Sequence, residues 1–182
     1  GWTQIEYGYI VTAFTAAYAI GLLLVGRMMD IFGTKKGYAA SLTGWSFAAI
    51  AHALAGSAFG FGVARFFLGF FEAGNFPAAI KTVAEWFPRK ERAFATGLFN
   101  AGSNVGAIIA PLVVPAIVSI WGWQEAFIIT GAVGFLWLFF WFKYYDTPEK
   151  SKYVSRAELE YIQSDPPDTL VKIPWKRLVR YR

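Results

Sequence analysis

The chain has 182 residues, of which 56% are hydrophobic and only 16% are charged, and this composition excludes an ordinary soluble domain. The absence of cysteine excludes disulfides and thiolate metal sites, and the single histidine, His52, excludes a site built from several histidines. The formal net charge of +5 is basic, but the positions of the charges are more informative than their sum.

Five apolar segments follow one another along the chain before a polar tail. Each is long enough to cross the hydrocarbon layer of a membrane, which takes about 20 residues of helix. We therefore expect residues 1–145 to form transmembrane helices over roughly 7–29, 37–56, 59–83, 93–120 and 124–145. The third segment is interrupted by three charged residues, Arg65, Glu72 and Lys81. No start methionine or signal peptide is visible, so we expect Gly1 to be an internal position.

The connections between these segments alternate in their content of lysine and arginine. Residues 27–36, 84–92 and 146–182 contain these cations, whereas the opposite connections contain none. Cytoplasmic loops of membrane proteins are enriched in Lys and Arg. We therefore expect the three basic stretches to be cytoplasmic and the chain to begin outside.

Residues 146–182 differ from the rest because they are polar and charged. Ser155 and Glu158 fit a capping box, which predicts a short amphipathic surface helix through Gln163. The last stretch, residues 172–182, is basic with interleaved aromatic residues. This pattern favours contact with anionic cytoplasmic lipid over nucleic-acid binding.

The connection between the first two segments carries a motif. GRMMDIFGTKK, residues 26–36, resembles the loop signature of the major facilitator superfamily at Gly26, Asp30, Gly33, Lys35 and Lys36. It departs at Ile31 and Thr34, where that family commonly has a basic residue. The resemblance implies an all-α membrane protein with two six-helix halves. The chain then corresponds to helices 2–6 of 12 plus the central cytoplasmic loop, so helix 1 and the C-terminal half are expected to lie outside this sequence.

Two further stretches carry a narrower resemblance. RFFLGFFEAGNFPAAIKTVAEWFPRKERA, residues 65–93, and GLFNAGSNVGAIIAP, residues 97–111, resemble the anion:cation symporter family, and within it the bacterial hexuronate transporters. The resemblance implies a proton-coupled symporter of the bacterial inner membrane that imports glucuronate or galacturonate by alternating access. Aldonates, aldarates and dicarboxylates stay open as alternative cargo.

Arg65 and Glu72 lie seven residues apart, on nearly the same face of a helix and roughly 10 Å from each other. An unpaired charge at membrane depth costs several kcal/mol, so both are expected to face a water-filled cavity or a protein partner. Burial favours a neutral carboxyl and a nearby arginine favours a charged one, which suits a site that loads and releases a proton. The resemblance places the proton-coupling glutamate at Glu72. A pair that only fixes helix packing is the alternative, and Arg65 either tunes Glu72 or holds the substrate carboxylate.

The expected substrate contacts come from three segments. In the fourth, Asn100, Ser103 and Asn104 lie on one broad face. Their polar groups suit sugar hydroxyls, although hydrogen bonds between helices explain them equally well. The resemblance places a substrate-contacting tyrosine near Tyr18, for which simple packing is the alternative. Asn75 follows Glu72 by one turn and is expected to orient it or to touch the ligand.

The motif loop is expected to form part of a cytoplasmic gate, because the resemblance gives it that role. The gate residues would be Gly26, Asp30, Gly33, Lys35, Arg89 and Arg92. Arg89 and Arg92 are the candidate partners of Asp30. A plain topology signal is the alternative. For His52, a surface or packing role is favoured over a proton relay.

Other classes of function fit the residues less well. Coupling to sodium is an alternative, since Asn75 and Ser103 offer neutral oxygens near a carboxylate. A non-transporting membrane receptor is a remote alternative, because it has no need of a buried Arg–Glu pair. An enzyme is not expected, since no metal-ligand cluster and no nucleophile beside a base is present, and no cofactor or metal is expected either.

Overall fold

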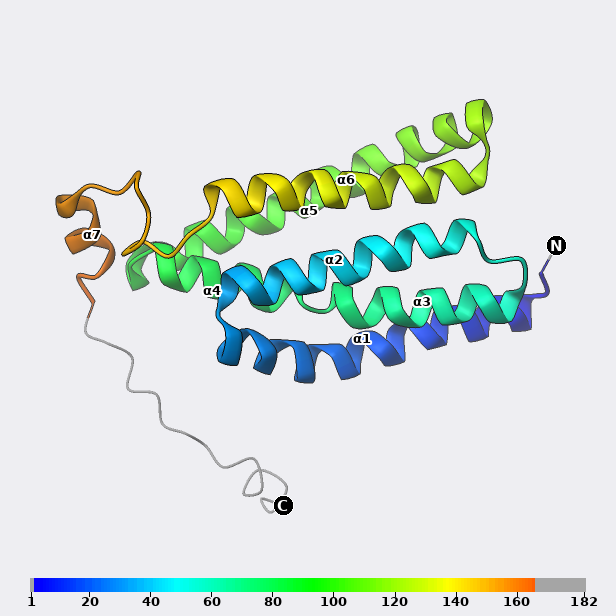
Figure 1. Cartoon of the computed structure of the whole chain (residues 1–182), viewed down its shortest axis with the longest axis horizontal. Coiled ribbons are helices and arrows are strands. Elements are labelled where there is room, and N and C mark those ends of the chain that lie inside the picture. The colour runs from blue at the N-terminus through cyan, green and yellow to red at the C-terminus, as the bar shows by residue number, and fades with distance from the viewer. Residues whose placement is uncertain (1, 166–182) are drawn as a thin grey trace, which may run out of the picture.

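The computed structural model of the protein describes residues 2–165, which form a bundle of seven α-helices (Figure 1). The helices are α1 Gln4–Phe32, α2 Thr34–Ala53, α3 Ala58–Glu72, α4 Asn75–Trp86, α5 Arg89–Trp121, α6 Trp123–Tyr144 and α7 Arg156–Ile162. The basic segment 172–182 lies outside the described residues.

The five predicted apolar segments correspond to α1, α2, α3 with α4, α5 and α6. Within residues 2–165, three helices are long and apolar enough to cross a membrane by length and composition, namely α1, α5 and α6. The segment expected over 59–83 differs from the prediction, because it is divided into α3 and α4.

The division between α3 and α4 has a cause in the sequence. Pro77 has no N–H to donate to the carbonyl of Ala73, four residues earlier. Regular helical bonding resumes when the Ala78 N–H donates to the Gly74 carbonyl at 3.1 Å. Ala73 and Gly74 keep right-handed helical dihedrals, so α4 continues along the bundle after a short interruption (Figure 1).

Glycines set the closest approaches between helices. A side-chain carbon at Gly21 of α1 would lie 2.5 Å from the carbonyl oxygen of Phe70 in α3, and one at Gly69 of α3 would lie 2.5 Å from that of Phe14 in α1. Gly131 of α6 approaches the backbone of α2 in the same way. Small residues at such crossings let two backbones pack closely in a membrane. α2 thus lies between α1 and α3 on one side and α6 on the other.

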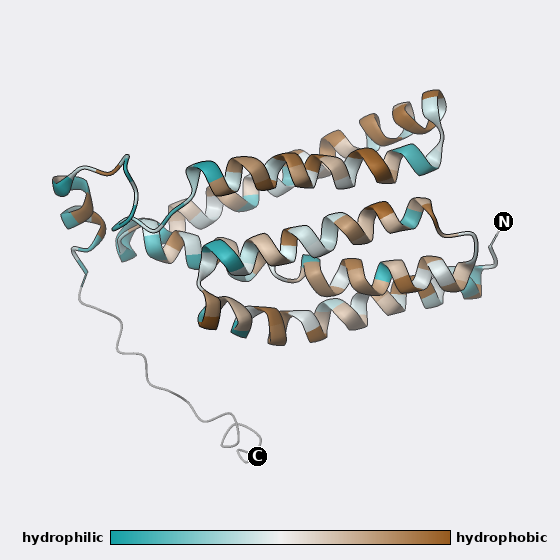
Figure 2. Cartoon of the chain, viewed as in Figure 1, coloured by the Kyte–Doolittle hydropathy of each residue, from teal (hydrophilic) through white to brown (hydrophobic). Residues whose placement is uncertain are grey.

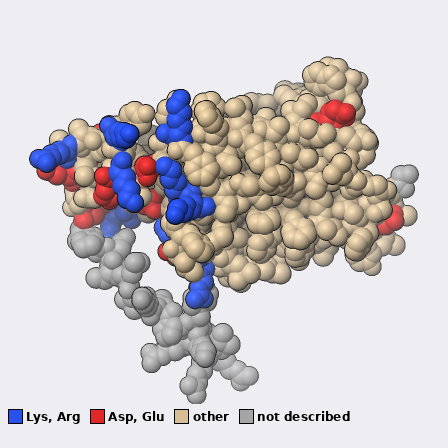
Figure 3. All heavy atoms as spheres, in the orientation of Figure 1, with Lys and Arg blue, Asp and Glu red and all other residues tan. Residues whose placement is uncertain are grey.

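The charges are gathered at one end of the bundle. Figure 3 shows lysines and arginines at the end where α7 lies, and only isolated acidic residues at the other end on the face in view. The flanks between the two ends are mainly apolar (Figure 2). Among the lysines and arginines of residues 2–165, Arg65 is the exception, because it lies within a predicted span and toward the opposite end. The basic end is the one that the sequence predicts to be cytoplasmic.

At the opposite end of the bundle, the buried ring of His52 in α2 contacts aromatic rings of α3 and α6. Its side chain is 0% exposed, and its ring stacks on Phe127 of α6 with centroids 4.8 Å apart. The edge of Phe61 of α3 meets the same ring at 4.7 Å, and Nδ1 lies 2.7 Å from the Ala48 carbonyl oxygen. These contacts give His52 the packing role favoured by the sequence.

Candidate functional site

The crossing of α1 and α3 places Tyr18 and Glu72 at the same depth of the bundle. Tyr18 lies on α1 between Phe14 and Gly21, which both closely approach α3. Glu72 lies on α3 beside the Ala73 side chain that Gly21 approaches. Tyr18 is half-buried and stacks on Phe14 with ring centroids 5.9 Å apart. Its aromatic body is therefore held by packing.

Glu72 is the last residue of α3, immediately before the interruption of the helix. Its side chain and that of Arg65 are both half-buried. Two ion pairs occur within residues 2–165, Lys35–Asp146 and Lys81–Asp30, so Arg65 and Glu72 do not form one. Arg65 nonetheless acts on the Glu72 carboxylate electrostatically. The arrangement is one of two charged groups two turns apart, rather than a locked pair.

Asn75 begins α4 directly after the interruption and lines a cavity of about 270 Å³. The other walls of this cavity come from α2, α5 and α6, including Tyr38, Phe99 and Trp137. Tyr18 and Glu72 do not line it. The structure therefore places Asn75 near Glu72 in the chain but turned toward a separate space.

The predicted polar face of α5 is open to the surroundings. Asn100, Ser103 and Asn104 are all exposed, while α5 packs against α4 and α6. The described residues thus do not gather these three side chains around Glu72. α5 also continues as a helix through Pro111 and Pro115.

The motif aspartate has a partner that the sequence analysis missed. Asp30 Oδ1 accepts from Lys81 Nζ of α4 at 2.9 Å, and the same ammonium donates to the Met29 carbonyl at 3.0 Å. The sequence prediction of Arg89 and Arg92 as the partners of Asp30 is therefore wrong, since Lys81 takes that position. Lys81 is closer to Asp30 than those arginines are expected to be, because α4 contacts α1.

Of the two motif glycines, Gly33 is favoured by its backbone conformation, whereas Gly26 has room for a side-chain carbon. Gly33 is the single residue between α1 and α2, and its φ of +81° lies in the region that disfavours side chains. Gly26 faces Pro77, from which a side-chain carbon would be 4.0 Å away. Gly33 therefore makes the tight reversal that brings Lys35 back toward α6.

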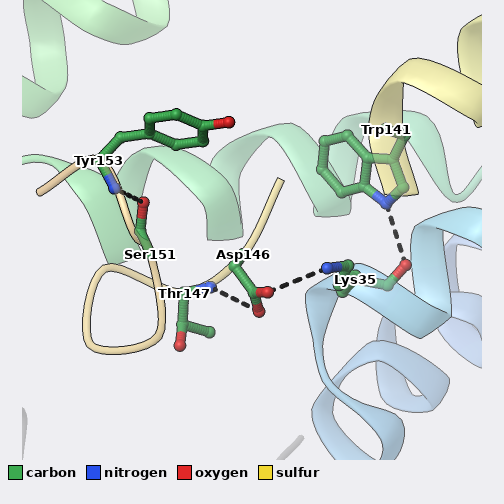
Figure 4. A network of polar contacts seen from close by, with 6 residues as sticks. All are labelled: Lys35, Trp141, Asp146, Thr147, Ser151 and Tyr153. Carbon is green, nitrogen blue, oxygen red and sulfur yellow. Dashed lines mark hydrogen bonds and ion pairs between the residues drawn. The ribbon is translucent and has the colours of Figure 1, made fainter. Parts of the chain in front are cut away.

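A polar network closes the basic end of the bundle (Figure 4). Lys35 Nζ pairs with Asp146 Oδ2 at 3.0 Å, and the Lys35 carbonyl accepts from Trp141 Nε1 of α6 at 3.0 Å. The hydrogen bond from Lys35 holds the pKa of the Asp146 carboxyl below its usual value. Glu85 of α4 accepts from Thr34 and from Tyr145, each at 2.6 Å.

Arg89 and Arg92 hold the connection between α4 and α5. Arg92 donates to the carbonyls of Phe87 and Ala84 at 3.0 Å each, so it caps the end of α4. The Arg89 N–H donates to the carboxylate of Asp165, which follows α7. α7 itself begins after Ser155, whose hydroxyl accepts from the Glu158 N–H at 3.2 Å.

The residues missed by sequence analysis share one property. Lys81, Glu85, Tyr145 and Asp146 each meet a partner far along the chain, as Lys81 meets Asp30 across 51 positions. One signal was available: Lys81 and Glu85 are four residues apart and so lie on one helix face.

The chain matches the Major Facilitator Superfamily over residues 1–182. It is 43% identical to the hexuronate transporter of Escherichia coli (strain K12) over 157 residues, which cover 86% of this chain and 36% of that protein. It is 42% identical to the galacturonate transporter of Dickeya chrysanthemi over 159 residues, 87% of this chain and 46% of that one. A D-galactonate transporter of Escherichia coli O6:H1 is 36% identical over 164 residues, 90% of this chain and 38% of that protein.

The chain thus spans less than half the length of these relatives. The match confirms the resemblance drawn from residues 26–36, 65–93 and 97–111. The relatives are transporters, in agreement with the expectation that the protein is not an enzyme. With its apolar helices and this match along its whole length, the chain belongs to the major facilitator superfamily as an all-α bundle of a multi-pass membrane protein.

Proposed function

We propose that the protein is a proton-coupled symporter that imports a sugar-acid anion, with a hexuronate as the preferred cargo. The observation that carries the proposal is the position of Glu72 at the interruption between α3 and α4. Interrupted helices near the middle of the membrane commonly form the substrate and coupling-ion sites of secondary transporters. The names of the relatives support the cargo, since they include hexuronate and galacturonate transporters.

Glu72 has the features that a proton carrier needs. Its carboxylate is half-buried, and within residues 2–165 it has neither an ion pair nor a hydrogen bond. Its charge is therefore not locked by a partner, and its protonation can follow whichever side of the membrane it faces. Arg65, two turns away on the same helix, supplies a positive charge that tunes this equilibrium.

The cargo contacts are proposed on the same grounds. Tyr18 lies level with Glu72, and the amide groups of Asn100 and Asn104, with the Ser103 hydroxyl, are exposed and so can meet sugar hydroxyls. Asn75 follows the interruption. The remaining contacts would come from a C-terminal half of the same protein, as the family fold implies, and the protein would lie in the bacterial inner membrane.

The test is transport by the full-length gene product in liposomes, comparing wild type with Glu72→Gln. This substitution keeps the shape of the side chain and removes its titration. Exchange of glucuronate or galacturonate without a gradient is measured beside accumulation driven by an inward proton gradient. The matched control is Glu125→Gln, which removes a carboxylate at the start of α6.

We expect Glu72→Gln to keep exchange and lose driven accumulation, while Glu125→Gln behaves as wild type. Retention of both modes in Glu72→Gln would show that Glu72 is structural. Accumulation driven by a sodium gradient, with none driven by protons, would favour the sodium-coupled alternative. Stronger transport of galactonate or a dicarboxylate than of a hexuronate would change the cargo and leave the coupling site intact.

A further inference from the structure

A basic cavity lies at the inner end of α6, apart from Glu72 and the predicted cargo contacts. It has a volume of about 260 Å³ and is lined by four lysines, Lys35, Lys143, Lys150 and Lys152, against one carboxylate, Asp146. Lys35 is neutralised by its ion pair with Asp146. Within the described part of the chain, the other three ammonium groups form no ion pair. The cavity therefore has an excess of positive charge.

An ordered turn holds two of these lysines beside the helix. The Thr147 carbonyl accepts from the N–H groups of Lys150 and Ser151 at 2.9 and 3.0 Å, and the Tyr153 N–H donates to the Ser151 hydroxyl at 3.3 Å. The Thr147 N–H donates back to Asp146 at 3.3 Å, so the turn is tied to the Lys35–Asp146 pair (Figure 4). The backbone that carries Lys150 and Lys152 is thus held beside the end of α6.

An apolar groove adjoins the basic cavity. It has a volume of about 380 Å³, and Tyr144 and Tyr145 line both spaces. Its walls are two aromatic stacks, Trp141 on Tyr145 with centroids 3.8 Å apart and Phe140 on Tyr144 with centroids 6.2 Å apart. The groove continues along α6 to Trp137, about two turns into the predicted span. Tryptophan and tyrosine at this depth are typical of the boundary between hydrocarbon and headgroups.

The two spaces together match a molecule with an anionic head and an apolar chain. We propose that the inner end of α6 binds one anionic phospholipid, with its phosphate among Lys143, Lys150 and Lys152 and an acyl chain along Trp137 and Trp141. Basic pockets at the cytoplasmic side of membrane helices recognise such headgroups. A free phosphate or a sugar acid would fill the basic cavity alone and leave the aromatic groove without a ligand. This site is independent of the proposed transport function.

The first test is native mass spectrometry of the full-length gene product, purified in a delipidating detergent and titrated with phosphatidylglycerol or phosphatidylcholine. The variant is Lys143→Gln/Lys150→Gln/Lys152→Gln. The control, Arg27→Gln/Lys36→Gln/Arg156→Gln, removes the same charge from the same end of the bundle, outside the cavity. All six side chains are exposed, so neither variant is expected to unfold.

We expect wild type and the control to bind one phosphatidylglycerol at least about ten-fold more tightly than phosphatidylcholine, and the cavity variant to lose this preference. A preference kept by the cavity variant, or lost equally by the control, would overturn the proposal. Competition separates the source of the anion. Displacement of phosphatidylglycerol by equimolar inorganic phosphate or glucuronate would assign the cavity to a small anion, whereas lipid that stays bound supports the lipid site.

Discussion

Lys81 is a single side chain that serves two acceptors at the basic end of the bundle. It pairs with the Asp30 carboxylate and donates to the Met29 carbonyl, at the end of α1. The Asp30 side chain is 75% exposed, so solvent weakens this ion pair and it contributes little by itself. The bond to the helix end adds a favourable interaction between a cation and the helix dipole.

We therefore expect Lys81→Gln to lower the free energy of unfolding by about 1 kcal/mol, and Asp30→Asn by about 0.5 kcal/mol or less. The measurement is unfolding of the purified protein in detergent, with the double variant completing the cycle. Equal losses from the two single variants would mean that the ion pair alone accounts for the role of Lys81.

The crossing of α1 and α3 depends on the absence of side chains at two glycines. A side-chain carbon at Gly21 would meet the backbone of Phe70 at 2.5 Å, and backbone cannot move aside as a flexible side chain does. We expect Gly21→Ala to destabilise the protein by about 1–3 kcal/mol, since the helices must separate. Transport should fall too, because the helix that carries Tyr18 would move away from the helix that carries Glu72.

Gly8 of the same helix is the matched control for this prediction. No atom lies within 4 Å of the position that its side-chain carbon would take. Gly8→Ala should therefore stabilise α1, by up to about 1 kcal/mol, through helix propensity alone. Thermal unfolding in detergent and initial rates of uptake measure both variants. A Gly21→Ala protein as stable as wild type would show that the crossing is looser than described.

The interruption between α3 and α4 is expected to be needed for transport. Pro77→Ala restores a donor for the Ala73 carbonyl, and the two helices can then join. We expect a rise in the unfolding temperature together with a fall in the rate of uptake, because the interruption beside Glu72 would close. Pro111→Ala, in the continuous helix α5, is the comparison. An unchanged rate in Pro77→Ala would remove the interruption from the mechanism.

The positions of the long helices were predictable because hydropathy is a local and additive property of the sequence. The divided third segment was less so, since apolar residues continue through the interruption and only Pro77 marks it. The pairs at the basic end were not predictable. Tyr145 meets Glu85 across 60 positions, and such a contact is set by the way helices pack rather than by any local pattern.

Residues 2–165 are polarised, with their lysines and arginines other than Arg65 toward the end where α1, α4 and α6 finish (Figure 3). Polar contacts join the helices at this end. Glu85 of α4, for example, accepts hydrogen bonds from Thr34 of α2 and from Tyr145, the residue after α6. The other end is packed chiefly by the rings around His52. From the positive-inside rule we propose that the basic end is cytoplasmic.

The sidedness can be tested directly because the chain contains no cysteine. We expect Lys36→Cys and Lys152→Cys to react with a membrane-impermeant thiol reagent only when the cytoplasmic face is exposed, as in inverted vesicles. Ser57→Cys, between α2 and α3, should react only in intact cells stripped of their outer membrane. The unsubstituted protein gives the background. Labelling of residues 36 and 57 from the same side would show that α2 does not cross the membrane. If residues 36 and 152 were labelled only from outside and residue 57 only from the cytoplasm, the orientation would be the reverse of the predicted one. The proposed lipid site would then lie in the outer leaflet.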